Sequence, residues 1–137
     1  MDYLNNLILL ENKELEEKIL YLEKNTKNKN FNLTKTDIKT LIITKNNTLK
    51  SLKRMEIGEP IILKLIEKLY TSPYLDNSNY LETLTEFIQI FYYYQQELSS
   101  YLTDIEILDK LILEFNDKGF IEENYLYLIK EEYETNR

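Results

Sequence analysis

The 137-residue sequence contains no cysteine, histidine or tryptophan, and it has only two glycines and two prolines. Without cysteine there can be no disulfide framework, thiol nucleophile or cysteine-ligated metal. Without histidine as well, serine–histidine and cysteine–histidine nucleophiles are excluded. Carboxylates are numerous, but no pair of them stands out as a general acid and base. We therefore expect no catalytic residue, cofactor or metal, and a carboxylate-dependent enzyme is only an alternative.

Alanine and valine are absent too, and arginine is rare, whereas lysine, asparagine, isoleucine, leucine and tyrosine are abundant. Alanine, glycine, proline and most arginine codons are GC-rich, and those of lysine, asparagine, isoleucine and tyrosine are AT-rich. The pattern indicates mutational bias in an AT-rich genome. A lysine or an asparagine therefore carries less functional information here than it would elsewhere.

The scarcity of glycine and proline favours helices joined by short polar turns. A content of 43% hydrophobic and 30% charged residues is typical of a globular chain, and this length suits one domain. We predict an all-α, compact single-domain bundle of six or seven helices over residues 1–137, with 1–32 forming helices and a polar loop and 33–135 the core. No signal peptide is apparent, and the longest uncharged stretch, 87–96, is too short to span a membrane. We therefore expect a cytoplasmic protein.

Helix-start and helix-end signals divide the chain into elements. The expected helices span about 3–10, 13–24, 34–53, 60–71, 80–98, 103–116 and 121–133. Thr34 with Asp37 and Thr103 with Glu106 have capping-box spacing, and Gly119 lies where a C′ glycine is expected. Turn residues at 76–79 should cap the helix over 80–98. That helix has the widest apolar face and should be central, with Tyr80, Leu84, Phe87, Phe91, Tyr94 and Leu98 on one side.

Basic residues concentrate in one segment. Residues 24–54 hold nine lysines and arginines against one acid, whereas the whole acidic chain has a net charge of −7. Lys35, Lys39, Lys50 and Lys53 fall within about 60° on a helical wheel, and Arg54 ends the segment. The stripe is either a binding surface for nucleic acid or an acidic protein, or a solvated lysine face produced by codon bias.

A DNA-binding interpretation of residues 33–60 depends on the turn within them. The segment superficially resembles a helix-turn-helix, whose tight turn often contains glycine. The turn would fall at Leu41, Ile42 and Ile43, which include no helix breaker. The apolar spacing instead favours one continuous helix. A DNA-binding regulator using residues 34–54 is the main alternative function.

Lys45 lies in the middle of the apolar face of that helix. Its neighbours on the wheel are Ile38, Leu41, Leu49 and Leu52. A lysine in this position extends its amine to solvent, pairs with a buried acid or contacts a ligand. We expect a buried or half-buried pair with an acid from another helix, and Glu86, which borders the polar face of its own helix, is a candidate.

Three consecutive tyrosines, Tyr92, Tyr93 and Tyr94, occur in the central helix. Consecutive helical residues point in different directions, so the three cannot all be buried. Tyr93 shares its side with glutamates, and exposed tyrosines flanked by acids suit a protein interface. The alternative is that tyrosine simply replaces apolar residues in this genome.

Two motifs carry a resemblance to a known family. They are TKNNTLKSLKRMEIG over 44–58 and SPYLDNSNYLETLTEFIQIFYYY over 72–94. The sequence resembles an uncharacterised family of small acidic helical proteins from low-GC Gram-positive, clostridial-type bacteria. The resemblance implies a continuous helix across Lys45, and that Lys45, Tyr74, Tyr80, Glu86 and Tyr92 should be tested first. It covers about two thirds of the chain, whereas the first forty residues match poorly.

These observations favour a protein–protein interaction module, acting as an accessory subunit or adaptor without catalysis. The partner would be another protein, and homo-oligomers are a further option. The net negative charge opposes approach to a DNA duplex except through the basic segment. The candidate interaction residues are Lys35, Lys39, Lys45, Lys50, Lys53, Arg54, Tyr74, Glu86, Tyr92 and Tyr93.

Overall fold

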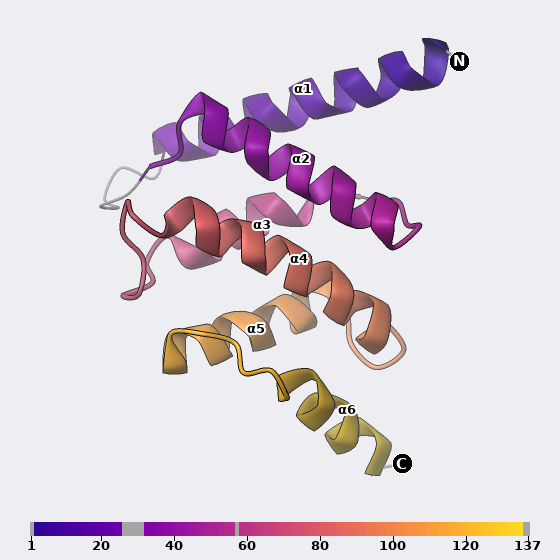
Figure 1. Cartoon of the computed structure of the whole chain (residues 1–137), viewed down its shortest axis with the longest axis vertical. Coiled ribbons are helices and arrows are strands. Elements are labelled where there is room, and N and C mark those ends of the chain that lie inside the picture. The colour runs from indigo at the N-terminus through magenta and orange to yellow at the C-terminus, as the bar shows by residue number, and fades with distance from the viewer. Residues whose placement is uncertain (1, 26–31, 57, 136–137) are drawn as a thin grey trace.

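The computed structural model describes residues 2–25, 32–56 and 58–135. Within these residues all regular structure is helical, which confirms the predicted fold class (Figure 1). The helices are α1 (Asp2–Asn25), α2 (Lys35–Ser51), α3 (Ile61–Leu69), α4 (Tyr80–Leu98), α5 (Asp104–Lys118) and α6 (Tyr125–Thr135). No described helix combines the length and the apolar character that crossing a membrane requires.

Helix α4 lies at the centre of the bundle and packs against α2, α3 and α5. In Figure 1, α1 and α2 lie at one end of the molecule and α6 at the other, with α4 between them. The predicted apolar face is confirmed: the buried residues of α4 are Tyr80, Leu84, Phe87, Ile88, Phe91, Tyr92, Tyr94 and Leu98. Tyr92 was not on the predicted face, but it is buried too, because α2, α3 and α5 cover α4 on several sides.

The first 25 residues correct one prediction. Separate helices were expected at 3–10 and 13–24, but α1 is continuous over Asp2–Asn25. Asn12, at the predicted break, is a weak helix former without being a breaker. Its Oδ1 accepts a hydrogen bond from Nδ2 of Asn46 on α2 at 3.1 Å, which holds this part of α1 against its neighbour. Most of the polar loop predicted over 25–32 lies outside the described residues.

Both predicted capping boxes form. Thr34 and Asp37 exchange the two expected hydrogen bonds at the start of α2, as do Thr103 and Glu106 at the start of α5. At the end of α5, Gly119 has φ +84°, the left-handed conformation predicted from its position. These local signals fix where two of the longer helices begin.

The turn required for a helix-turn-helix does not form. Leu41, Ile42 and Ile43 all lie inside α2, and Leu41 and Ile42 are buried on its inner face. The prediction of one continuous helix is therefore confirmed. The helix ends at Ser51, slightly before the predicted end, in a turn that places Lys53 at φ 57°.

One predicted helix cap and one predicted helix start differ from the structure, whereas α4 has the predicted bounds. Asn79 does not cap α4 with its side chain: its Nδ2 donates to the carbonyl of Tyr74 and its Oδ1 accepts from the Asp76 amide, each at 2.9 Å. These bonds stabilise the turn that precedes the helix. Helix α6 begins at Tyr125 instead of at residue 121. Glu122, in the connection, pairs with Lys118 at the end of α5.

Candidate functional site

Lys45 forms an ion pair on the inner side of α2. Its Nζ lies 3.3 Å from Oε1 of Glu56, and the two side chains are only 13% and 12% exposed. The expected half-buried pair is present, but its acid is in the α2–α3 connection instead of on another helix. Glu86 is exposed on α4, so naming it as the partner was wrong. A helical wheel includes only the residues of one helix, so it could not indicate Glu56, which lies between α2 and α3.

The other oxygen of Glu56 holds two further groups. Oε2 accepts hydrogen bonds from the hydroxyl of Tyr92 and, at 3.1 Å, from the backbone amide of Ile61, the first residue of α3. Glu56 therefore joins α2, α3 and α4 at one point. Glu56 was not among the residues predicted from the sequence, although a negative charge near a helix N-terminus is favoured by the helix dipole.

Tyr92 belongs to this internal cluster and not to the surface. Its side chain is 1% exposed, and burial, together with the nearby Glu56 carboxylate, raises its pKa. Tyr80 is buried to the same extent, and burial with the neighbouring Glu23 raises its pKa as well. A buried hydroxyl held by a carboxylate cannot contact a partner, so the selection of Tyr92 as an interaction residue is corrected.

The predicted basic stripe is exposed. Lys35, Lys39, Lys50 and Lys53 all face solvent on or just after α2. Arg54 does not join them: it is half-buried, and its Nη1 is enclosed. The structure therefore separates the last residue of the basic segment from the four surface lysines.

Tyr93 lies in a groove between α4 and α6. The groove has a volume of about 460 Å³, and Tyr94, Leu126 and Tyr127 form its apolar part. Four glutamates and one lysine complete its lining: Glu97, Glu123, Lys130, Glu131 and Glu134. Tyr93 is 51% exposed, whereas Tyr94 is buried and burial raises its pKa to about 12. Of the four acids around Tyr93, two come from α6 and one from the connection before it, none of which the α4 wheel included.

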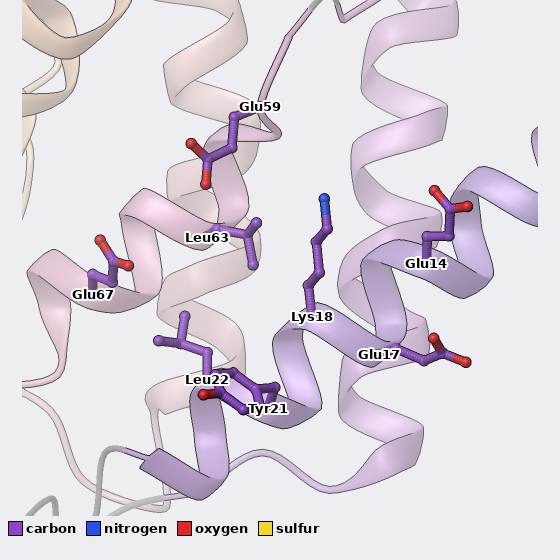
Figure 2. A pocket seen from close by; sticks show the side chains of 8 residues that line it. All are labelled: Glu14, Glu17, Lys18, Tyr21, Leu22, Glu59, Leu63 and Glu67. Atoms are coloured by element: carbon purple, nitrogen blue, oxygen red, sulfur yellow. The ribbon is translucent and has the colours of Figure 1, made fainter.

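A second groove lies between α1 and α3 (Figure 2), with a volume of about 490 Å³. Leu22 and Tyr21 from α1 and Leu63 from α3 form its apolar part. Its remaining residues are the glutamates 14, 17, 59 and 67 and a single lysine, Lys18. Figure 2 shows the Lys18 side chain standing between the two helices. No sequence motif singled out this groove, because its two walls are some forty residues apart.

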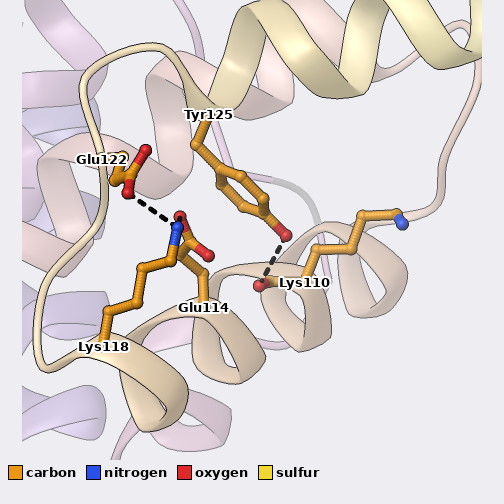
Figure 3. Close-up of polar contacts among 5 residues, drawn as sticks. All are labelled: Lys110, Glu114, Lys118, Glu122 and Tyr125. Carbon is orange, nitrogen blue, oxygen red and sulfur yellow. Dashed lines mark hydrogen bonds and ion pairs between the residues drawn. The ribbon is translucent and has the colours of Figure 1, made fainter.

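Polar contacts attach α6 to α5 (Figure 3). Glu114 is one of the few buried charged residues, and Lys118 Nζ lies 3.4 Å from it and 2.8 Å from Glu122. The Tyr125 hydroxyl donates to the backbone carbonyl of Lys110 at 3.1 Å. These contacts account for the positions of the residues in Figure 3 and hold the start of α6, so we interpret the cluster as structural.

Tyr74 lies beside the end of α5. Its hydroxyl donates to the carbonyl of Asp117 at 3.4 Å, and its ring meets Phe115 edge to face, with centroids 5.8 Å apart. A Cβ on Gly119 would lie only 3.0 Å from Cδ1 of this ring. Although its ring is partly exposed, Tyr74 therefore has a packing role.

The described residues contain no group of three or more side chains positioned to hold a metal ion. The features that remain are two grooves lined by apolar and acidic side chains, and the cluster around Glu56.

Comparison with known proteins gives a family and no activity. No curated protein and no solved structure matches the chain significantly. One family model, described as a family of unknown function (DUF6323), matches residues 18–127. The match includes both motifs of the predicted resemblance and extends further toward the N-terminus than we expected. The chain therefore belongs to this family of unknown function, DUF6323.

Proposed function

We propose that this protein is a protein–protein interaction module that binds a basic, amphipathic helix of a partner in the groove between α1 and α3. The observation that carries the proposal is the combination of an apolar floor and a largely acidic rim in one open groove. The proposal keeps the accessory or adaptor role predicted from the sequence. Our predictions of a cytoplasmic location and a clostridial-type bacterial origin accompany it.

The apolar part of the groove supports a helical occupant. Leu22 and Leu63 face each other across the gap in Figure 2, and Tyr21 beside them is 72% exposed. Amphipathic helices bind grooves of this kind by inserting apolar side chains spaced one turn apart. An exposed tyrosine adds contact area at a low cost in side-chain entropy.

The charge of the rim supports a basic occupant. Four glutamates oppose one lysine, so the groove has a local net charge of −3. Complementary charges increase the rate of association and reject partners of the wrong sign. Lys18, which stands between the helices, would pair with an acid of the occupant or with a rim glutamate, and so would help to set its register.

The groove between α4 and α6 supports a second contact of the same chemistry. Tyr93 and Tyr127 are exposed there beside glutamates, as an interface for a basic segment requires. An arginine or lysine of the partner could lie over either ring. Because this groove is at the opposite end of the bundle from α1 (Figure 1), the two sites would be occupied independently.

The proposal can be tested by comparing three forms of the full chain in affinity purification from the native cell. The first is the unchanged chain, and the second carries Glu17→Lys and Glu67→Lys on the two walls of the groove. The third carries Glu82→Lys and Glu86→Lys, two matched charge reversals on exposed α4 surface outside both grooves. We expect one protein to be retained by the first and third forms and lost from the second.

The purified partner then provides a stricter measurement. Its binding segment should be a basic amphipathic helix, and Tyr21→Ala should weaken binding by about tenfold or more, as at other interfacial tyrosines. Affinity should fall as salt rises, because the rim charges are exposed. A partner that binds all three forms equally, or that lacks such a helix, would contradict the proposal.

A further inference from the structure

A small cavity lies beneath the connection between α2 and α3. Its volume is about 190 Å³. Its polar lining comes from three places in the chain: Arg54, Glu56 and Glu59 in the connection, Gln95 near the end of α4, and Asp104 at the start of α5. A share of about 30 Å³ per water molecule in the liquid gives room for roughly six waters or one small organic molecule.

Two enclosed atoms of this cavity have no hydrogen-bond partner among the described residues: Nη1 of Arg54 and Oε1 of Glu56. Oε1 of Glu56 still has the ion pair with Lys45, whereas Nη1 of Arg54 has no acid within ion-pair distance among the described residues. A guanidinium with an enclosed, unpaired N–H is costly, because the group has lost water and gained nothing in exchange. An acceptor that enters the cavity from solution, either water or the oxygen of a ligand, would satisfy this N–H.

Two of the three neighbouring carboxylates, those of Glu56 and Asp104, are in contact with other groups. Glu56 is bound by Lys45, Tyr92 and the amide of Ile61. Asp104 accepts a hydrogen bond from Nε2 of Gln95 at 2.7 Å. A guanidinium and three carboxylates therefore share one cavity, and Glu56 and Asp104 form their contacts with groups other than Arg54.

The backbone before Arg54 holds this arrangement in place. The amide of Arg54 donates to the carbonyl of Leu49 at 2.9 Å, and that of Lys53 donates to Lys50 at 3.1 Å. This pair of bonds is the Schellman motif that usually has glycine at its left-handed position. Here Lys53 occupies that position with φ 57°, which is unfavourable for a side-chain-bearing residue. Strain of this kind is found at functional sites, where it fixes the direction of the chain.

We propose that this cavity binds a free α-amino acid. Its carboxylate would accept from the guanidinium of Arg54, and its ammonium group would donate to Asp104, with Glu59 at the edge of the cavity. The planar guanidinium matches a carboxylate, to which it can make two parallel hydrogen bonds. A phosphate fits poorly because carboxylates line the same space, and a simple amine leaves Arg54 unsatisfied. This site is separate from the proposed partner groove, except that Glu59 borders both.

The test uses the purified full chain and the twenty amino acids, each added singly at millimolar concentration. We expect one or a few of them to raise the melting temperature by about 5 °C at saturation. The corresponding amine without a carboxylate and the corresponding acid without an amine should each produce little or no shift. Calorimetry then gives the dissociation constant of any amino acid that stabilises the chain.

Three variants decide whether the effect belongs to this cavity. Arg54→Met should abolish the response while the melting temperature without ligand stays the same or rises, since an unpaired group has been removed. Asp104→Asn should weaken binding by about tenfold, the loss expected for one charged hydrogen bond. Lys50→Gln, an exposed change at the end of the same helix, should leave the response unchanged.

The proposal is overturned if no amino acid stabilises the unchanged chain, or if Arg54→Met responds as the unchanged chain does. If Arg54→Met fails to fold, Arg54→Lys serves instead: it keeps the charge but loses the paired hydrogen bonds, and it should weaken binding by about tenfold. Equal binding by Arg54→Lys and the parent would also overturn the site. None of these changes alters the α1–α3 groove, so the two proposals can fail separately.

Discussion

The amine of Lys45 and the carboxylate of Glu56 meet 3.3 Å apart on the inner side of α2, and both side chains are almost fully enclosed. Glu56 also accepts hydrogen bonds from Tyr92 and from the first amide of α3. The positive charge of Lys45, in the middle of an apolar helix face, is therefore paired with an acid that also forms hydrogen bonds to α3 and α4. The first prediction concerns this pair.

Lys45→Met should destabilise the protein by about 3 kcal/mol, because the change leaves the carboxylate of Glu56 buried without its counter-charge. Chemical unfolding in urea measures the difference. Lys39→Met, on the exposed side of the same helix, is the control and should change stability by less than about 0.5 kcal/mol. A Lys45→Met variant as stable as the parent would show that the pair contributes nothing.

Stability should fall in alkaline solution because of three buried tyrosines. Burial is the main cause that raises the pKa of Tyr80, Tyr92 and Tyr94, the last to about 12, from the ordinary value of 10.0. Above about pH 10 the folded chain thus holds more protons than the unfolded chain. The stabilisation is complete below that pH and is lost as pH rises, by up to about 1.4 kcal/mol per tyrosine per pH unit.

Ultraviolet absorbance of tyrosinate, followed together with circular dichroism, checks the alkaline prediction. Part of the tyrosinate signal should appear only when helicity is lost. Tyr94→Phe should reduce the slope of stability against pH. Complete ionisation of all the tyrosines while the chain stays folded would contradict the burial of these three hydroxyls.

Lys53→Gly should stabilise the protein by about 0.5–1 kcal/mol. Lys53 has φ 57° at the end of α2, and glycine adopts this conformation without steric cost. The melting temperature should rise by about 2–5 °C. Lys50→Gly, inside the last turn of α2, is the matched control and should lower stability by a similar amount. A decrease for Lys53→Gly would mean that its left-handed conformation carries no strain.

Gly119→Ala should destabilise the protein more than Gly58→Ala does. Both glycines have positive φ, +84° and +91°, so an added Cβ is strained at each. Only at Gly119 would the Cβ also meet the Tyr74 ring, at 3.0 Å, whereas nothing lies within 4 Å at Gly58. We expect about 2 kcal/mol at Gly119 and about 1 kcal/mol at Gly58. In a Tyr74→Ala background the two costs should become similar, and a persistent difference would contradict the contact.

Sequence alone determined the features that depend on residues close together in the chain. The capping boxes at Thr34 and Thr103 and the turn at Gly119 each involve residues within four positions, so their bonds form whenever a helix starts or ends there. The apolar face of α4 follows from a period of 3.6 residues. The position of Lys45 on an apolar face also predicted that its amine needs a charged or polar partner.

Only the tertiary structure decided which acid pairs with Lys45, which tyrosines are buried and where the grooves lie. Glu56 is in a connection, where no periodicity indicates a direction, and it reaches Lys45 only because α2 and α4 pack together. Tyr92 is buried because α4 is covered on several sides, which a helical wheel cannot include. The walls of the groove in Figure 2 come from helices that are distant in sequence. Local rules set the helices, but the positions of side chains across a bundle follow from packing between helices.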